Sequence, residues 1–218
     1  KKIDKISYEE MLEMSSMGAK VLHTRSVELA MKNNLTLQVL SSLTNQKGTL
    51  IVNEKVLIEK EVVSGVSYSK NESKITISGI PDKPGISATI FGILSKNDIN
   101  VDMIVQNISQ DGVSANLTFT VQFNDMEISK RLLEKNHKKI SFKTISSDSE
   151  VSKISVVGMG MMSQSGVAEK MFKTLANKKI NILAISTSEI KISVLIEKKY
   201  TEEAIKSLHS AYNLDITK

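Results

Sequence analysis

Residues 74–109 read KITISGIPDKPGISATIFGILSKNDINVDMIVQNIS, a stretch that passes from a strand through a glycine turn into a helix and a second strand. Ile75 and Ile77 lie two positions apart, which is the period of a strand with one buried face. Apolar side chains then recur every three or four positions from Ile86 to Leu94, so a helix with one apolar stripe should follow the turn.

The same pattern returns at residues 153–190, which read KISVVGMGMMSQSGVAEKMFKTLANKKINILAISTSEI. With a two-residue difference in the turn, the copies align at Gly79, Gly85, Leu94, Ile99 and Asn100 in the first and at Gly158, Gly166, Leu175, Ile180 and Asn181 in the second. A further alternating strand and a final helix follow in each copy. The order β-α-β-β-α-β predicts an α+β fold of tandem ferredoxin-like modules, each an antiparallel sheet with both helices on one face.

The composition is that of a folded protein without disulfides. The chain has 218 residues, 40% of them hydrophobic, and no cysteine, so we expect two or three small cores and no thiolate chemistry. Its net charge of +5 comes almost entirely from lysines interleaved with acids, which favours a solvated surface over a nucleic-acid partner. The sequence has neither a long uncharged apolar run nor an apolar leader, which predicts a cytoplasmic protein without a membrane partner.

The sequence contains no recognisable catalytic constellation. A GxxxxGK[S/T] phosphate loop is absent, and Gly158-Met159-Gly160 lacks the third glycine of a dinucleotide fingerprint, since Ser163 stands there. The three histidines, at positions 23, 137 and 209, are far apart and show no metal-ligand spacing. We therefore nominate no catalytic residue and no metal site.

The turn of the first copy has binding chemistry. Residues 81–87 read PDKPGIS, with the only two prolines of the chain ahead of Gly85. The amides that open the following helix, at Gly85, Ile86 and Ser87, lie at the positive end of the helix dipole and suit a carboxylate. Asp82 offers a counter-charge to an ammonium group. Together these groups would satisfy both ends of a free amino acid.

Two points leave this interpretation open. Gln106, on the next strand, could add an orienting amide, but Asp82 could also simply cap the helix, which is the commoner use of this pattern. A polar turn at residues 163–166 of the second copy favours the binding interpretation. Asn100 and Asn181 are more often turn residues than ligands.

Three further strings resemble a known family. They are ISYEEMLEMSSMGAKVLHTRSVELA at 6–30, DKPG at 82–85 and ISTSEIKISVLI at 185–196, and they are similar to the C-terminal half of aspartokinases. There, the end of an amino-acid-kinase domain precedes paired ACT modules. The resemblance covers essentially the whole chain, apart from details such as Thr24, where proline is usual. It implies a kinase-domain remnant at 1–60, ACT module one at 61–148 and ACT module two at 149–218.

The resemblance also implies a function. The complete enzyme would phosphorylate the side-chain carboxylate of aspartate with MgATP, the first step toward lysine, threonine and methionine, with its nucleotide-binding elements upstream of this chain. This chain alone would hold no cofactor and turn over no substrate. It would bind lysine and/or threonine for feedback inhibition, form a homodimer through its ACT modules and contact a catalytic kinase domain or subunit.

When the effector site of the aspartokinase family is transferred to this sequence by position, the resemblance implies that it uses module one and the residues just before the second strand of module two. Its residues would be Asp82, Gly85, Ile86, Ser87 and Gln106, facing Asn181 and Ile182. By pseudo-symmetry, a second site would use Met161, Ser163, Gly166 and Val167 with Asn100, Val101 and Asp102, and with Thr187 and Glu189.

Two other classes of protein share this order of elements. A free-standing ACT sensor, or the regulatory chain of another amino-acid enzyme, would lack the kinase-like first 60 residues. An RNA-recognition module needs aromatic residues and arginines on its central strands. Phe119 and Phe123 are present, but no RNP-like string surrounds them.

Overall fold

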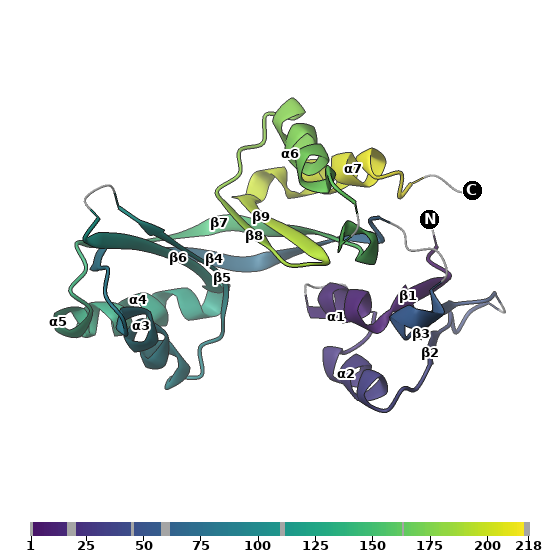
Figure 1. Cartoon of the computed structure of the whole chain (residues 1–218), viewed down its shortest axis with the longest axis horizontal. Helices are drawn as coiled ribbons and strands as arrows, with labels where there is room; N and C mark the ends of the chain where they lie inside the picture. The colour runs from purple at the N-terminus through teal and green to yellow at the C-terminus, as the bar shows by residue number, and fades with distance from the viewer. Residues whose placement is uncertain are drawn as a thin grey trace.

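One antiparallel sheet of six strands, in the order β5-β6-β4-β7-β9-β8, joins the two repeats (Figure 1). The computed structural model describes residues 2–16, 21–44, 46–57, 62–109, 112–162 and 164–215. The strands of the sheet are β4 (Gly65–Pro81), β5 (Val101–Ile108), β6 (Ser114–Gln122), β7 (Thr144–Val157), β8 (Ala184–Thr187) and β9 (Lys191–Glu197).

The two central strands pass through both modules. β4 pairs with β7 from Gly65 opposite Val157 to Ser78 opposite Thr144. The second half of β4 also pairs with β6, and the second half of β7 also pairs with β9. Each module therefore has the four-stranded sheet that its sequence predicts, but the two sheets share β4 and β7 and form one continuous layer.

Strand pairing departs from the predicted linear boundaries at 61–148 and 149–218. Residues 65–69 of β4 fall inside the predicted range of module one, yet they pair with residues 153–157 in the sheet of module two. Module one is thus inserted between the first strand of module two and the rest of it. Without these residues, β7 would present an unpaired backbone edge here, because no strand follows α7 (Thr201–Ala211) among the described residues.

The helices of the two modules lie on opposite sides of the sheet (Figure 1). Module one contributes α3 (Ile86–Ser95), α4 (Met126–Lys135) and the short α5 (His137–Ile140), and module two contributes α6 (Val167–Asn177) and α7. Short 3-10 turns precede the helices at η2 (Phe123–Asp125), η3 (Met159–Met162) and η4 (Lys198–Tyr200). Separate apolar cores result, one around Ile77, Leu94 and Phe119, the other around Val156, Met171 and Val194. The predicted α+β class with antiparallel sheets is confirmed.

The N-terminal residues form a separate small unit. Its elements are β1 (Lys5–Ser7), α1 (Tyr8–Ser16), α2 (Thr24–Lys32), β2 (Leu37–Val39), β3 (Thr49–Val52) and the 3-10 turn η1 (Glu54–Val56). The three strands form a sheet in the order β1-β3-β2, with β1 parallel to β3. Tyr8, Val27 and Ile51 are fully or almost fully buried at its centre. Across the described part of the chain, no helix has both the length and the apolar character of a membrane span.

Candidate functional site

The turn from β4 into α3 has the backbone geometry that its glycine allows. Gly85 is the N-cap of α3 with φ 93° and ψ −12°, a left-handed conformation that residues with a side chain rarely adopt. A Cβ built on Gly85 would meet no atom within 4 Å, so the space in front of the helix is open. Thr89 N donates the first main-chain bond of the helix to Gly85 O at 2.9 Å, and Ile86 N donates a longer one to Lys83 O at 3.5 Å. The amides of Ser87 and Ala88, in the same turn, point out of the helix.

Asp82 is exposed and does not cap α3. The N-terminus of α3 has no side-chain cap, so the capping alternative is not what the structure has. Instead, the backbone amide of Asp82 donates to Val113 O at 3.0 Å, which holds the turn against the start of β6. The carboxylate thus lies beside the helix entrance without serving the helix itself.

A hydrogen bond links α3 to the neighbouring strand. Ser87 Oγ donates to Gln106 Oε1 at 2.9 Å, and both residues lie at the same end of module one as Gly85. Ile86 is buried in the core of this module and anchors the first turn. The structure therefore brings together five of the predicted residues, Asp82, Gly85, Ile86, Ser87 and Gln106.

Module two repeats this turn with different side chains. Gly166 is the N-cap of α6 with φ 91° and ψ −5°, and a Cβ there would also meet nothing within 4 Å. Ahead of it Met161 packs against the core of module two, and after it Val167 is buried in that core. Predicted site residue Ser163 lies outside the described residues. The alignment places Ala168 and Thr187 where module one has its Ser–Gln pair.

Strand register places the predicted site residues at two ends of each module: an outer end at the glycine turn, and an inner end where β5 or β8 begins. Pro81 and Ile108 are level with the start of β6, whereas Val101 pairs with Val121 at its end. The 82–87 turn therefore lies at the opposite end of module one from Asn100, Val101 and Asp102. In module two, likewise, Thr187 lies level with Ile192 at the turn end, next to Glu189, while Asn181 and Ile182 precede β8 at the other end.

The inner ends of β5 and β8 meet each other. Met103, on β5, is buried against Leu183, Ala184 and Leu195 of module two. One chain thus brings the inner residues of both predicted sites together, at the start of these strands. It does not bring Asn181 and Ile182 to the 82–87 turn, nor Asn100 to Gly166.

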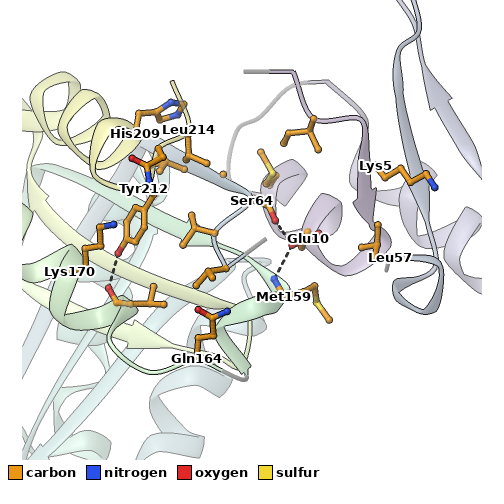
Figure 2. Close-up of a pocket in the computed structure, with 18 of the residues that line it drawn as sticks. Lys5, Glu10, Leu57, Ser64, Met159, Gln164, Lys170, His209, Tyr212 and Leu214 are labelled. Carbon is orange, nitrogen blue, oxygen red and sulfur yellow. Dashed lines mark hydrogen bonds between the residues drawn. The ribbon is translucent and has the colours of Figure 1, made fainter. Parts of the chain in front are cut away.

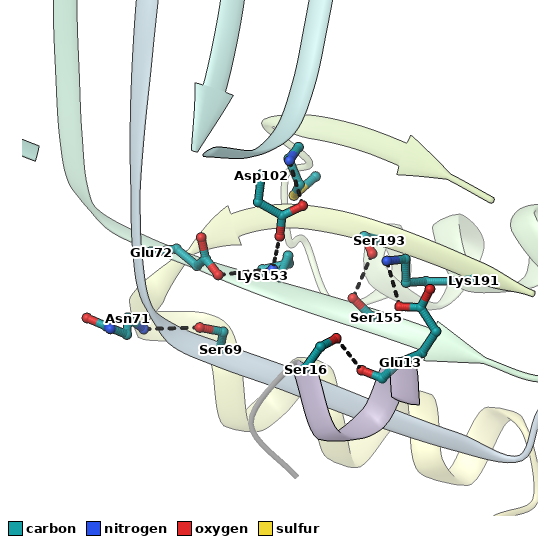
Figure 3. Close-up of polar contacts among 11 residues, drawn as sticks. Glu13, Ser16, Ser69, Asn71, Glu72, Asp102, Lys153, Ser155, Lys191 and Ser193 are labelled. Carbon is teal, nitrogen blue, oxygen red and sulfur yellow. Dashed lines mark hydrogen bonds and ion pairs between the residues drawn. The ribbon is translucent and has the colours of Figure 1, made fainter. Parts of the chain in front are cut away.

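An ion network crosses this junction, with Lys153 and Glu72 buried and Asp102 exposed (Figure 3). Lys153 Nζ, on β7, lies 3.0 Å from Glu72 Oε1 on β4 and also donates to Asp102 Oδ2 on β5. Burial works to raise the pKa of Asp102, but the hydrogen bond and charge of Lys153 and the amide of Met103 outweigh it and leave the pKa below its ordinary value. Burial likewise works to lower the pKa of Lys153, but the charges of Glu72 and Asp102 leave it raised.

A cleft of about 990 Å³ separates the N-terminal unit from module two (Figure 2). Lys5 and Glu10 line it on one side, and Met159, Gly166 and Lys170 line it on the other.

The sequence analysis predicted neither this cleft nor the ion network around Lys153. A signal existed for Glu10, since Ser7 and Glu10 have the S-x-x-E spacing of a capping box. No described group of three or more acidic or histidine side chains is arranged to hold a metal ion.

Comparison with known proteins identifies the family of the two repeats. Residues 74–137 and 154–212 match the ACT domain family. The chain is 47% identical over 215 residues to the aspartate kinase of Pseudomonas fluorescens, covering 98% of this chain and 52% of that protein. It therefore spans about half the length of the curated relatives that it matches.

Two solved structures give the same assignment. The ligand-free regulatory subunit of aspartate kinase from Thermus thermophilus is 35% identical with a TM-score of 0.64, and the match covers 69% of this chain and 98% of that one. Aspartate kinase from Clostridium acetobutylicum is 26% identical with a TM-score of 0.87, over 98% of this chain and 49% of that one. The chain belongs to the aspartate kinase family and corresponds to its regulatory region, which contains the ACT domains.

Proposed function

We propose that this chain senses end-product amino acids for an aspartate kinase, with lysine and/or threonine as effectors bound at the turn of module one. The observation that carries the proposal is the open left-handed turn at Gly85, close to the exposed Asp82 and to the Ser87–Gln106 pair. The effector would adopt one orientation there, because its two charged ends need partners of opposite sign.

The chemistry of the turn fits a zwitterion. The carboxylate of the effector would accept hydrogen bonds from the first amides of α3, where the helix dipole favours negative charge. Its ammonium group would pair with the Asp82 carboxylate, and the side-chain amide of Gln106 would orient it. The space that Gly85 leaves empty gives the effector backbone room to approach.

A second copy of the chain would complete this site. Asn181 and Ile182 lie at the inner end of module two, away from the 82–87 turn of their own chain, so they would reach the effector only from a partner. This supports a homodimer formed through the ACT modules.

A second candidate site lies in module two. Its residues would be Met161, Ser163, Gly166 and Val167, with Asn100, Val101, Asp102, Thr187 and Glu189. No acidic residue lies in residues 159–166, so Glu189 would have to supply its counter-charge.

Effector binding would act on a kinase domain or subunit. An amino acid that binds one arrangement of the modules more tightly shifts the whole protein toward that arrangement by its differential affinity. The complete protein would use MgATP and aspartate in the cytoplasm and would be inhibited by its pathway's end products. This chain alone would not consume ATP in the presence of aspartate.

Titration calorimetry of the 218-residue chain with lysine and with threonine tests the proposal. We expect Asp82→Ala to weaken binding about tenfold or more, because it removes a charged partner. Glu134→Ala, which removes an exposed acid from α4, is the matched control and should leave the affinity unchanged. Absence of binding of both amino acids to the wild-type chain would contradict the effector assignment, and equal affinity of Asp82→Ala and wild type would remove Asp82 from the site.

A further inference from the structure

Helix α1 is fastened to module two by a buried acid. Glu10 Oε1 accepts hydrogen bonds from Met159 N at 2.9 Å and from Ser64 Oγ at 2.5 Å (Figure 2). Glu10 Oε2 accepts a bond from Ser7 N at 3.1 Å, while Glu10 N donates to Ser7 Oγ. One side chain therefore caps its own helix and binds the first residue of η3 in module two.

Further along α1 the contacts with module two are both polar and apolar, since the side chain of Met14 lies against Gly65 of β4. Glu13 Oε2, one helical turn further along α1, lies 2.7 Å from Lys191 Nζ of β9 (Figure 3). Ser193 shares a sheet face with Lys191 and bonds Ser155 of β7 at 2.7 Å. This face differs from the opposite one, where apolar side chains such as Val156 and Val194 interlock with α6 and α7. Interlocked apolar cores resist displacement, whereas polar contacts can be exchanged for others.

Glu10 binds at the start of the module-two turn. Met159 opens η3, and the chain then runs through this turn to Gly166, the left-handed N-cap of α6. At the other end of the same short segment, Tyr212 of the α7 end donates to Val167 O at 2.7 Å and ties the first residue of α6 to α7. Displacing this turn must therefore either break the Glu10 bond or move α1.

We propose that Glu10 is a positioning residue that makes the module-two turn and helix α1 change conformation together. Among the described residues, the turn of module one has no such contact with the N-terminal unit, because the outer end of module one lies away from that unit (Figure 1). Module two would thus be the module that communicates with the kinase side of the chain. This coupling does not depend on where an effector binds, so it goes beyond the function proposed above.

Hydrogen exchange of the α1 amides from Met11 to Ser16 tests the coupling in the full chain. Gly166→Ala introduces a side chain at φ 91° without a steric clash, so it strains the module-two turn alone. We expect about fivefold or faster exchange in α1 of this variant. Gly85→Ala is the matched control, with φ 93° and the same open space, and should leave α1 exchange unchanged.

Combining Gly166→Ala with a second substitution, either Glu10→Ala or Ser7→Ala, tests whether Glu10 couples the module-two turn to α1. In Glu10→Ala, we expect Gly166→Ala to produce no additional change in α1. In Ser7→Ala, which weakens the same helix cap but keeps the Met159 bond, the response to Gly166→Ala should persist. A response that survives in Glu10→Ala, or none in the wild-type background, overturns the proposal. Should Glu10→Ala alone abolish protection of α1, then equal effects of Gly166→Ala and Gly85→Ala in the wild-type background would overturn it.

Adding lysine or threonine to the same exchange measurement separates this proposal from the effector assignment. If neither amino acid binds while Gly166→Ala still accelerates α1 exchange, the coupling holds and the effector assignment fails. If an amino acid binds and Gly166→Ala leaves α1 unchanged, the coupling fails and the effector assignment holds.

Discussion

The turn of module one and the turn of module two have nearly the same backbone but different surroundings. Gly85 and Gly166 differ by 2° in φ, at 93° and 91°, and both face open space. Asp82 and the Ser87–Gln106 pair flank the first turn, whereas the second begins at an amide that Glu10 holds. The two repeats thus share the conformation that glycine allows, but one turn lies beside an exposed acid and a Ser–Gln pair, whereas the other is bonded to the neighbouring unit.

The largest effect that distinguishes the two turns should come from Glu10→Ala. This change leaves Met159 N, Ser64 Oγ and Ser7 N without their acceptor at a buried position, and each lost partner costs about 1 kcal/mol or more, so we expect a loss of about 3 kcal/mol. Urea unfolding at neutral pH measures it. Ser87→Ala, which removes the exposed bond of the other turn, should cost less than about 1 kcal/mol. Equal losses would mean that the two turns are held alike.

A smaller and symmetric effect is expected from the two glycines. Gly85→Ala and Gly166→Ala should each lower the free energy of unfolding by about 1 kcal/mol, because alanine is strained at these positive φ values while its Cβ meets no atom. Thermal and urea unfolding of both variants check this. A difference of more than about 1 kcal/mol between them would show that the turns are not equivalent in conformational strain.

The smallest effect concerns the junction between the modules and depends on pH. The folded pKa of Asp102 lies below its ordinary value of 3.8, so its contribution to stability is complete above that value and is lost as the pH falls through the lower folded pKa. Lys153, whose pKa is raised above 10.5, contributes below that pH and loses its contribution as the pH rises through the folded pKa. We expect the free energy of unfolding of wild type to approach that of Asp102→Asn as the pH is lowered from 5 to 2. A constant difference between the two over this pH range would contradict the assignment.

The repeats were predictable because their signals are local. Glycine at the turn, the apolar stripe of α3 and the alternation of Ile75 and Ile77 depend only on neighbouring positions. The same local pattern indicated the turn around Asp82 and Ser87, although it could not exclude capping. In the structure, Ser87 donates a hydrogen bond to Gln106, and α3 has no side-chain cap.

The junctions were not predictable because they depend on contacts distant in sequence. Residues 62–68 alternate in the sequence as a strand does, but alternation does not identify the partner strand, which is the second half of β7. Ser7 and Glu10 have the spacing of a capping box, yet the bond to Met159 spans 149 positions and leaves no trace in spacing. Lys153 likewise follows an ordinary alternating pattern, and only the fold brings Glu72 and Asp102 to it.

The interleaved strand order has a practical consequence for anyone who wishes to graft this regulatory region onto another protein. Because residues 65–69 belong to module two while module one follows them, module two cannot be excised as one segment. A fragment starting at Lys74 would leave the edge of β7 bare and prone to self-association. The smallest fragment that keeps module two intact is therefore a continuous block from about residue 62 to residue 215, which also contains module one.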